Sequence, residues 1–493
     1  MQRYESFGEC LKRCLKEGGI SASEAARLVG FRSRNSIFRI LSGDTSGEVN
    51  LRFLSALHQA LGSEWPEDRW FALQEALDVE RLGLERYQAN RAFHRVLHDQ
   101  METIPEYVVS EFLADGSTKE FPLADVLAGA AGAARAEIVI TGCCDSGLTL
   151  LLADKCAEAG ARGTLTIRHY IDTAEETVCQ NILGILPLVS KPWYNARLVA
   201  PGSCPAEMMA IYRLHAIHIH RWDEAGKLYG SMYIRYDEQH FTNRFEAEGR
   251  CPAVDVLDRW RFHLELLKPM PKVSEGPQVF VEYTAQYAQL EDNCTILSIK
   301  PDVYFNCIPA ALLEQAVIEG FEQSGMAAGP ELVELVKTLK QVHDRRFDNM
   351  MHKRKPTHLV LSLPAMERFM RTGVLSDQFF IQRAYTVDER RQIVRVLLEK
   401  MRQQLYFNVH FMKEGAPALR YEISYYDGKG VLLMDAYTGY DLDAEHSEAL
   451  ITLPGFMKGF QRYFKEELLT HYVMSRSETI SAMERLLVMN VQE

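Results

Sequence analysis

The hydrophobic periodicity of the chain changes near residue 105, and this change limits the folds open to it. In residues 1–104 apolar side chains recur every three or four positions, which is typical of amphipathic helices. Beyond that point strand-like and helix-like segments alternate, as in EIVITG (137–142), SGLTLLLADKCAEAG (146–160) and TLTIRHYI (164–171). A strand, a helix and a strand with short connections predict a βαβ unit. We therefore expect a multidomain chain, with an all-α N-terminal domain followed by an α/β region built on mixed sheets.

The length of 493 residues is enough for two or three domains. We expect an N-terminal domain over 1–66, a helical connector over 67–104, a first α/β lobe over 105–270 and a second over 271–493. The two lobes are predicted to be related, because each contains an expected hairpin (215–236 and 419–437) followed by an expected helix (256–267 and 456–469).

Residues 22–41 have the pattern of two helices joined by a tight turn. Such a unit needs a small residue where the helices cross, a turn-compatible residue between them and branched apolar residues on the inner face of the second helix. Ala26, Gly30, Ile37 and Ile40 meet these needs if the turn holds one extra residue. A further helix, expected to be capped by Asn50, follows. The segment is predicted to be a helix-turn-helix, with a four-helix protein-interaction module as the alternative.

With its flanking helices, this segment resembles the Cro and phage-repressor type of helix-turn-helix domain, the XRE family, found in many bacterial transcription regulators. AARLVGF, SIFRILSG and NLRFLSALHQALG follow the family's order of positioning helix, recognition helix and following helix. The resemblance covers the first 63 residues and implies a homodimer whose recognition helices enter the major groove of double-stranded DNA. The family's frequent glutamine is replaced by the serines of 21–23, so base identity is not carried over. The implied DNA-binding residues are Arg32, Ser33, Arg34, Asn35, Ser36 and Arg39.

The charge of the chain is unevenly distributed. The whole chain has a formal net charge of −12. Residues 1–66 contain nine basic and seven acidic side chains, a net of +2, so the remainder has −14. Residues 32–39 contain three arginines and no acid, and arginine binds guanine or phosphate while asparagine suits adenine. DNA binding is therefore predicted to be confined to the N-terminal domain and to depend strongly on salt.

Signals of catalysis are weak. The sequence contains neither GxxxxGK[ST] nor GxSxG, and we expect no catalytic residue, metal or cofactor. The turn after EIVITG joins the end of a strand to the start of a helix, where a small anionic ligand binds readily. Cys144, Asp145 and Ser146 are therefore candidate ligand-binding residues, with an ordinary capped helix start as the alternative.

A histidine cluster, His215, His218 and His220, lies on the first expected hairpin. Metal ligation would need a third converging ligand, so a half-buried hairpin is the simpler interpretation. His215, Asp223 and Gly230-Ser231 are similar to the HxK, D and GS pattern of phospholipase-D-like enzymes. Ile217 occupies the lysine position, which puts such catalysis in doubt.

The sequence has no apolar run of 18 residues and no apolar signal-peptide core at its start, so a cytoplasmic protein without a membrane partner is expected. The ten cysteines are scattered and are expected to be reduced.

Together these features favour a sequence-specific DNA-binding transcription regulator with large lobes for ligand sensing or oligomerisation. The effector would be a small molecule or a peptide, and rearrangement of the lobes would change the spacing of two N-terminal domains. One alternative is an enzyme, a hydrolase or nuclease, localised by its helix-turn-helix. A second alternative is a protein-interaction scaffold.

Overall fold

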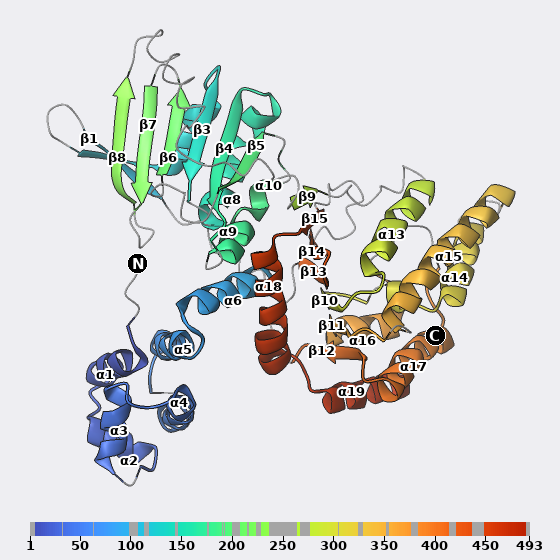
Figure 1. Ribbon diagram of the computed structural model, residues 1–493, viewed down its shortest axis with the longest axis horizontal. Helices are drawn as coiled ribbons and strands as arrows, with labels where there is room; N and C mark the ends of the chain where they lie inside the picture. Colours follow the sequence, from blue (N-terminus) through green and yellow to red (C-terminus); the bar gives the residue numbers. More distant parts are fainter. Residues whose placement is uncertain are drawn as a thin grey trace.

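The chain forms an N-terminal helical unit followed by two lobes, each built on a mixed sheet (Figure 1). This confirms the expected fold class. The computed structural model describes residues 5–31, 33–62, 64–97, 107–112, 118–142, 146–174, 177–189, 191, 193–199, 208–213, 216–222, 228–235, 264–266, 277–303, 305–323, 329–351, 354–375, 383–413, 421–435 and 448–489.

Six helices form the N-terminal part of the chain. They are α1 (Phe7–Glu17), α2 (Ala22–Leu28), α3 (Arg34–Leu41), α4 (Gly47–Leu61), α5 (Glu67–Leu82) and α6 (Leu84–Leu97). Leu73 and Leu77 of α5 are fully buried in the same core as residues of α1 to α4. The helices α1 to α5 are called here the N-terminal unit. Gly83 separates α5 from α6 with a φ of 83°, a conformation that glycine adopts most easily.

The start of α4 differs from expectation. We predicted that Asn50 caps this helix, but α4 begins at Gly47 and Asn50 lies inside it, fully buried. Asn50 Oδ1 accepts a hydrogen bond from Thr45 Oγ1 at 2.6 Å, and its Nδ2 donates to Glu80 Oε1 of α5 at 2.7 Å. The asparagine therefore joins α4 to α5 rather than ending a helix.

Lobe 1 comprises residues 107–235. Its six-stranded sheet has the order β5-β4-β3-β6-β7-β8, in which β3, β4 and β5 are parallel and β6, β7 and β8 are antiparallel to their neighbours. The predicted βαβ unit is confirmed as β3, α8 and β4. The strands are β3 (Ala136–Thr141), β4 (Leu165–Asp172), β5 (Tyr194–Val199), β6 (Met208–Arg213), β7 (Ala216–Trp222) and β8 (Leu228–Arg235). The other elements are β1 (Val108–Phe112), β2 (Thr118–Pro122), α7 (Leu123–Ala131), α8 (Ser146–Ala161), α9 (Val178–Gly184) and α10 (Leu186–Val189).

Lobe 2 comprises residues 264–489. Its sheet has the order β12-β11-β10-β13-β14-β15-β9. The strands are β9 (Leu264–Leu266), β10 (Ile296–Lys300), β11 (Thr357–Leu361), β12 (Phe407–Phe411), β13 (Tyr421–Tyr426), β14 (Gly430–Asp435) and β15 (Glu448–Ile451). The helices are α13 (Pro277–Glu291), η2 (Phe305–Cys307), α14 (Ala310–Gln323), α15 (Pro330–Met351), α16 (Leu363–Thr372), α17 (Val387–Gln403), α18 (Pro454–Arg462), η3 (Tyr463–Tyr472) and α19 (Arg476–Val488). The capping box predicted for Thr386 and Glu389 begins α17.

The two sheets repeat one topology. In each sheet the first three strands of the repeat are parallel, β3 to β5 in lobe 1 and β10 to β12 in lobe 2. The next three strands, β6 to β8 and β13 to β15, are antiparallel to their neighbours and extend the sheet from the opposite edge of its first strand. The expected hairpins 215–236 and 419–437 are both present, but they are not equivalent, because β7–β8 corresponds to β14–β15 and β13–β14 corresponds to β6–β7. The two hairpins were matched because their turn sequences are similar, but such turn sequences occur in any hairpin and do not show equivalence.

The helix predicted for 256–267 is also corrected in part. Residues 264–266 form the strand β9, which pairs with β15 at the edge of the lobe 2 sheet. Residues 256–263 lie outside the described residues. The matching prediction for 456–469 is confirmed, because α18 and η3 form a continuous helical segment that widens to π-helix at Tyr463.

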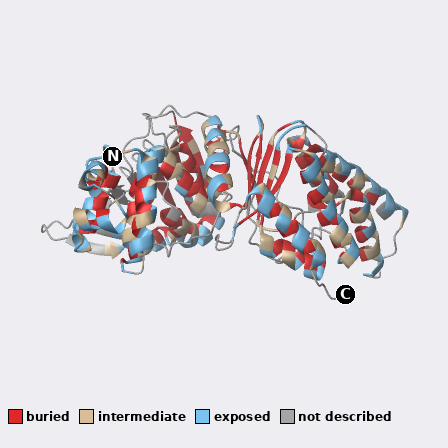
Figure 2. Cartoon of the chain, turned by 90° about the horizontal axis from the view of Figure 1, so that it is seen from below, coloured by how far each residue is buried: buried red, intermediate tan, exposed pale blue. Residues whose placement is uncertain are grey.

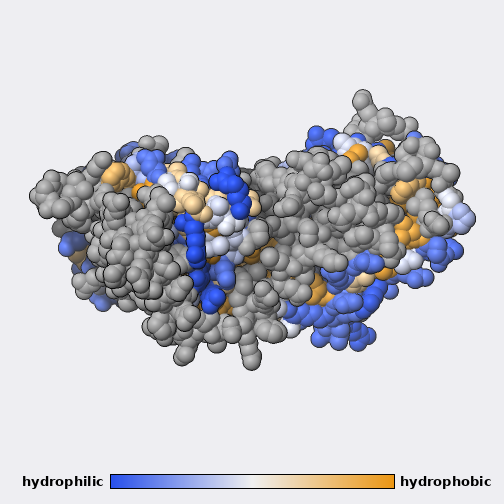
Figure 3. Space-filling view, turned by 90° about the horizontal axis from the view of Figure 1, so that it is seen from above, coloured by the Kyte–Doolittle hydropathy of each residue, from blue (hydrophilic) through white to orange (hydrophobic). Residues whose placement is uncertain are grey.

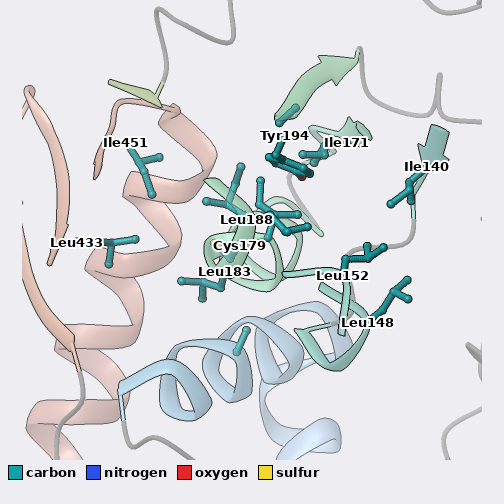
Figure 4. Close-up of a cluster of buried hydrophobic side chains, with 14 of the residues drawn as sticks. Ile140, Leu148, Leu152, Ile171, Cys179, Leu183, Leu188, Tyr194, Leu433 and Ile451 are labelled. Carbon is teal, nitrogen blue, oxygen red and sulfur yellow. The ribbon is translucent and has the colours of Figure 1, made fainter. Parts of the chain in front are cut away.

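One hydrophobic core joins the lobes. It contains Ile138 and Ile140 from the lobe 1 sheet together with Leu297 and Ile299 from the lobe 2 sheet. Helices α7 to α10 lie on the lobe 1 side of this core, α18 and η3 lie on the lobe 2 side, and α6 packs on elements of both lobes. Figure 4 shows residues of both lobes around α9. The other face of the lobe 2 sheet is covered by helices of lobe 2, so its strands are almost wholly buried (Figure 2).

Helix α6 anchors the N-terminal unit to this shared core. Phe93 is fully buried, and its ring centroid lies 5.4 Å from that of Phe456, 5.5 Å from Phe460 and 5.2 Å from Tyr463. Aromatic pairs at such distances add about 0.5–1.5 kcal/mol each beyond the area that they bury. The α6 helix therefore packs on α18 and η3 of lobe 2 through Phe93, and it also packs on α9 of lobe 1.

On the face shown in Figure 3, the described residues are mainly hydrophilic, with hydrophobic residues singly or in small groups. None of the described helices is long and apolar enough to cross a membrane. The six cysteines in the described part of the chain are buried, and no disulfide joins any of these six.

Replacing Phe93 with alanine should loosen α6 without unfolding the N-terminal unit. The change removes a large buried side chain and is expected to cost about 3–5 kcal/mol. The N-terminal unit has a separate core, so amide hydrogen exchange should accelerate in α6 and α18 while α1 to α4 keep their protection. Equal acceleration in α1 to α4 would contradict this division.

His169 should make the stability of lobe 1 fall in mild acid. This residue of β4 is fully buried, its Nδ1 lies 2.9 Å from Tyr194 Oη, and burial lowers its pKa to about 3. The unfolded chain takes up this proton near pH 6.5, so the free energy of unfolding should fall by about 1.4 kcal/mol per pH unit below that pH for this group alone. In His169→Phe, the slope of the free energy of unfolding against pH between pH 6 and 4 should be smaller by the contribution of one proton. Denaturant unfolding at several pH values measures this slope.

Tyr194→Phe is the matched control for this experiment. It removes the hydroxyl that bonds His169 but keeps the titrating ring. It should lower stability at every pH while leaving the slope unchanged, and an equal change of slope in both variants would argue against His169 as the source.

Candidate nucleic-acid interface

Helices α2 and α3 lie where the helix-turn-helix is predicted. Ser21 caps α2 by accepting a hydrogen bond from the backbone N–H of Glu24, and residues 29–33 connect the two helices. Within this connection Gly30 has a φ of 74°, and the backbone N–H of Phe31 bonds the carbonyl of Ala26 at 2.8 Å. A glycine with positive φ after the last turn is the usual way to end such a helix.

The inner face of α3 is fixed in the core of the N-terminal unit. Ile37 and Ile40 are 0% and 1% exposed, and Ala25 and Ala26 of α2 are buried in the same core. Of the predicted helix-turn-helix core, Ala26, Ile37 and Ile40 are buried and Gly30 lies in the turn with positive φ, while their role as the core of a DNA-binding unit stays a prediction. The orientation of α3 is set by these contacts.

A glycine that sequence reasoning missed brings α1 against the end of α3. A Cβ atom at Gly8 would lie 2.7 Å from the carbonyl oxygen of Ile40 and 2.8 Å from that of Leu41. Such distances are shorter than real Cβ contacts, so only glycine permits this approach. A glycine inside an otherwise good helix pattern was the available signal.

The outer face of α3 carries polar groups. Asn35 and Arg39 are exposed and lie four residues apart, so they share this face. Arg39 donates a hydrogen bond to the backbone carbonyl of Asp44 at 3.2 Å, and Ser42 Oγ donates to the Asp44 carboxylate at 2.6 Å. Arg39 is thereby held along the helix rather than left to turn freely.

The other predicted DNA-binding residues have different positions. Ser33 is exposed and caps α3, because its Oγ accepts from the backbone N–H of Asn35 at 3.2 Å. Ser36 is half-buried. Arg34 begins α3, but its side chain is not among the described ones, and Arg32 lies outside the described residues. The DNA-binding role of all six residues stays a prediction.

Two further exposed arginines lie on the helices before and after α3 in the sequence. The side chains of Arg27 on α2 and Arg52 on α4 are each 79% exposed. Arg27 lies 3.7 Å from Glu24, and Arg52 lies 2.6 Å from Glu48. Exposed pairs of this kind contribute only about 0.3–0.5 kcal/mol, so either guanidinium can exchange its carboxylate for a phosphate at little cost.

The predicted ligand-binding turn falls largely outside the described residues. Cys144 and Asp145 are outside them, and Ser146 begins α8 with a side chain that is not described. His215 is likewise outside, while His218 and His220 lie on β7 with side chains that are not described. In the described part of the chain, no group of three or more His, Cys, Asp or Glu is placed to hold a metal ion.

Comparison with known proteins gives only distant structural similarity. No family model matches the sequence, and no curated protein sequence matches it. One similar structure is that of the archaeal chromatin protein TrmBL2, which shows a novel mode of DNA binding. The match covers 40% of this chain and 67% of the TrmBL2 chain at 12% identity, with a TM-score of 0.20. The phosphatidylserine synthase of Haemophilus influenzae covers 82% of this chain and 96% of its own at 11% identity, with a TM-score of 0.23. Neither similarity is strong enough to assign a function.

Two glycines of the N-terminal unit, Gly30 and Gly8, should respond differently to alanine. Gly30→Ala adds a Cβ with no atom within 4 Å, so its cost is the positive φ alone, about 1–2 kcal/mol. Gly8→Ala gains helix propensity but places its Cβ against two carbonyl oxygens, and overpacking of this kind costs about 1–3 kcal/mol. Hydrogen exchange should show α3 loosened by Gly8→Ala. A stabilised Gly8→Ala, as helix propensity alone would give, would mean that α1 and α3 do not approach so closely.

Proposed function

We propose that this chain is a sequence-specific DNA-binding transcription regulator whose two lobes sense a ligand or mediate assembly. The observation that carries the proposal is the two-sided character of α3. Ile37 and Ile40 hold one side in the core, while Asn35 and Arg39 stand on the other. A rigidly held helix with asparagine and arginine outward has the groups that read adenine and guanine in the major groove.

The charge of the N-terminal unit supports the same proposal. The segment from Arg32 to Gly43 contains three arginines and no acid, and residues 1–66 have a net charge of +2 in a chain of −12. Arg27 and Arg52 add exposed cations on the neighbouring helices. Exposed basic groups on α2, α3 and α4 suit contacts with phosphates.

The lobes provide a route for regulation. Helix α5 packs in the N-terminal unit, and α6 is held between α9 of lobe 1 and α18 and η3 of lobe 2. A change in how the lobes meet would therefore move α6 and, through Gly83 and α5, the helix-turn-helix. In a homodimer such a movement would change the spacing of two recognition helices, which must match half-sites about one DNA turn apart. An effector bound at the turn that contains Cys144, Asp145 and Ser146 would act by this route.

Asn35→Ala tests the proposal. Binding sites would first be selected from a random duplex pool with the full chain, and affinities would then be measured by fluorescence anisotropy at two salt concentrations. We expect the variant to lose its preference for adenine at one position of the half-site, at a cost of about 1–3 kcal/mol, with an unchanged salt dependence because no charge is removed.

Lys337→Ala is the control for nonspecific charge effects. Lys337 is an exposed residue of α15, in lobe 2 and far from α3 in Figure 1. Its loss should leave both affinity and selectivity unchanged. A pool that yields no enriched sequence, or an Asn35→Ala variant with unaltered selectivity, would contradict the proposal.

A further inference from the structure

A phenylalanine shares the exposed face of α3 with the polar residues. Phe38 is 55% exposed, whereas Ile37 and Ile40 beside it in the sequence are buried. It lies three residues after Asn35 and one before Arg39, so helical geometry places it on the flank of the face that these two residues define. Phe38 was not among the residues predicted from the sequence, although its spacing of three residues from Asn35 indicates that the two lie close together on a helix.

An exposed phenylalanine by itself is ordinary, and its surroundings decide its meaning. Phe38 is not needed in the core of the N-terminal unit, which is closed beneath it by Ile37 and Ile40. No acid occurs between Arg32 and Gly43, so a polyanion can approach this face without repulsion from the helix itself. An apolar ring within a basic and amide-bearing face matches a surface that has both hydrogen-bonding and apolar groups.

The major groove of DNA has such a surface. Each base pair there presents hydrogen-bonding groups, and thymine adds a 5-methyl group, which phenylalanine is known to contact. From residue 35 to residue 38 a helix rises about 4.5 Å, close to the roughly 3.4 Å between neighbouring base pairs. Asn35 and Phe38 can therefore reach neighbouring pairs at the same time.

We propose that Phe38 is a specificity-determining residue that contacts the 5-methyl group of a thymine next to the base pair reached by Asn35. This inference rests on the proposed DNA binding and adds to it one base identity. The energy comes from removing the methyl group and part of the ring from water. One buried methyl group corresponds to about a fourfold change in affinity for each half-site.

Deoxyuridine provides a direct test, because it differs from thymidine only by the missing methyl group. Sites selected with the full chain would be resynthesised with each thymine replaced in turn by deoxyuridine. The unaltered chain should lose about fourfold in affinity per half-site at one position. Phe38→Ala should bind the thymine and deoxyuridine versions of that position equally.

The matched control is Phe71→Ala. Phe71 lies on α5 and is 56% exposed, nearly the same as Phe38, so it reports the effect of removing any exposed phenylalanine. This variant should keep the full discrimination between thymine and deoxyuridine. Thermal unfolding of both variants would verify that they are folded.

The outcomes separate this inference from the proposed function. If no DNA sequence is enriched, both fail. If a sequence is enriched but every thymine tolerates deoxyuridine, or Phe38→Ala keeps the discrimination, the inference is wrong while DNA binding stands. If Phe38→Ala instead changes the sedimentation of the chain without DNA and leaves the discrimination intact, Phe38 is a contact between two copies and the inference is overturned.

Discussion

The close contact between α9 and α18 is the constraint on which the rest of the architecture depends. A Cβ atom at Gly459 of α18 would lie 2.4 Å from Cys179 Sγ of α9, and one at Gly455 would lie 3.1 Å from a methyl carbon of Val178. Two glycines four residues apart thus let side chains of a lobe 1 helix pack directly against the backbone of a lobe 2 helix. Because the helices are this close, the two sheets share one core, and Phe93 of α6 is enclosed by α18 and η3. The attachment of the N-terminal unit follows from the packing of the lobes.

The outer part of that attachment is more polar than its centre. Arg86 of α6 pairs with Glu466 of η3, and Asn90 donates a hydrogen bond to Glu467 at 3.4 Å. Burial raises the pKa of Glu467 and also that of Asp78 on α5, and the two carboxylates repel each other. Partly buried carboxylates with raised pKa values oppose the folded arrangement at neutral pH. The helix is therefore anchored by the aromatic cluster at Phe93, while the polar rim adds little stability and can rearrange.

The sequence predicted helices and strands well where a periodic pattern or a capping motif extends over many residues. It predicted them poorly where the same residues fit two different local structures. The βαβ unit, the capping box at Thr386 and the α/β character of both lobes follow from periodicity and capping chemistry. Asn50 was misread because an asparagine before an apolar run signals a cap, whereas here it bonds Glu80 inside the structure. Short central strands such as β6 and β10 were missed, since a segment of five or six mostly apolar residues is too short to distinguish a strand from part of a buried helix. The domain boundaries stay predictions.

Prediction of the candidate site was limited by geometry rather than by residue type. The sequence selected Asn35 and Arg39 but could not show that Ser33 caps the helix or that Asp44 holds Arg39. It also overlooked Gly8, because the need for glycine there arises from contact with carbonyl oxygens of another helix. Contacts between segments that are far apart in the sequence cannot be predicted from local sequence patterns.

The distribution of charge bears on how DNA would be recognised. At physiological salt, charges are screened beyond about 8 Å. The net charge of −14 on residues 67–493 therefore repels a phosphate bound at α3 only weakly. The +2 of the first 66 residues is a small net attraction, so salt-dependent affinity must come from individual arginines that contact phosphates. Selectivity must come from groups that contact bases, which is the role proposed for Asn35 and Phe38. A regulator built in this way would gain little from nonspecific DNA, and its selectivity would depend on having two such helices fixed at the correct spacing by the lobes.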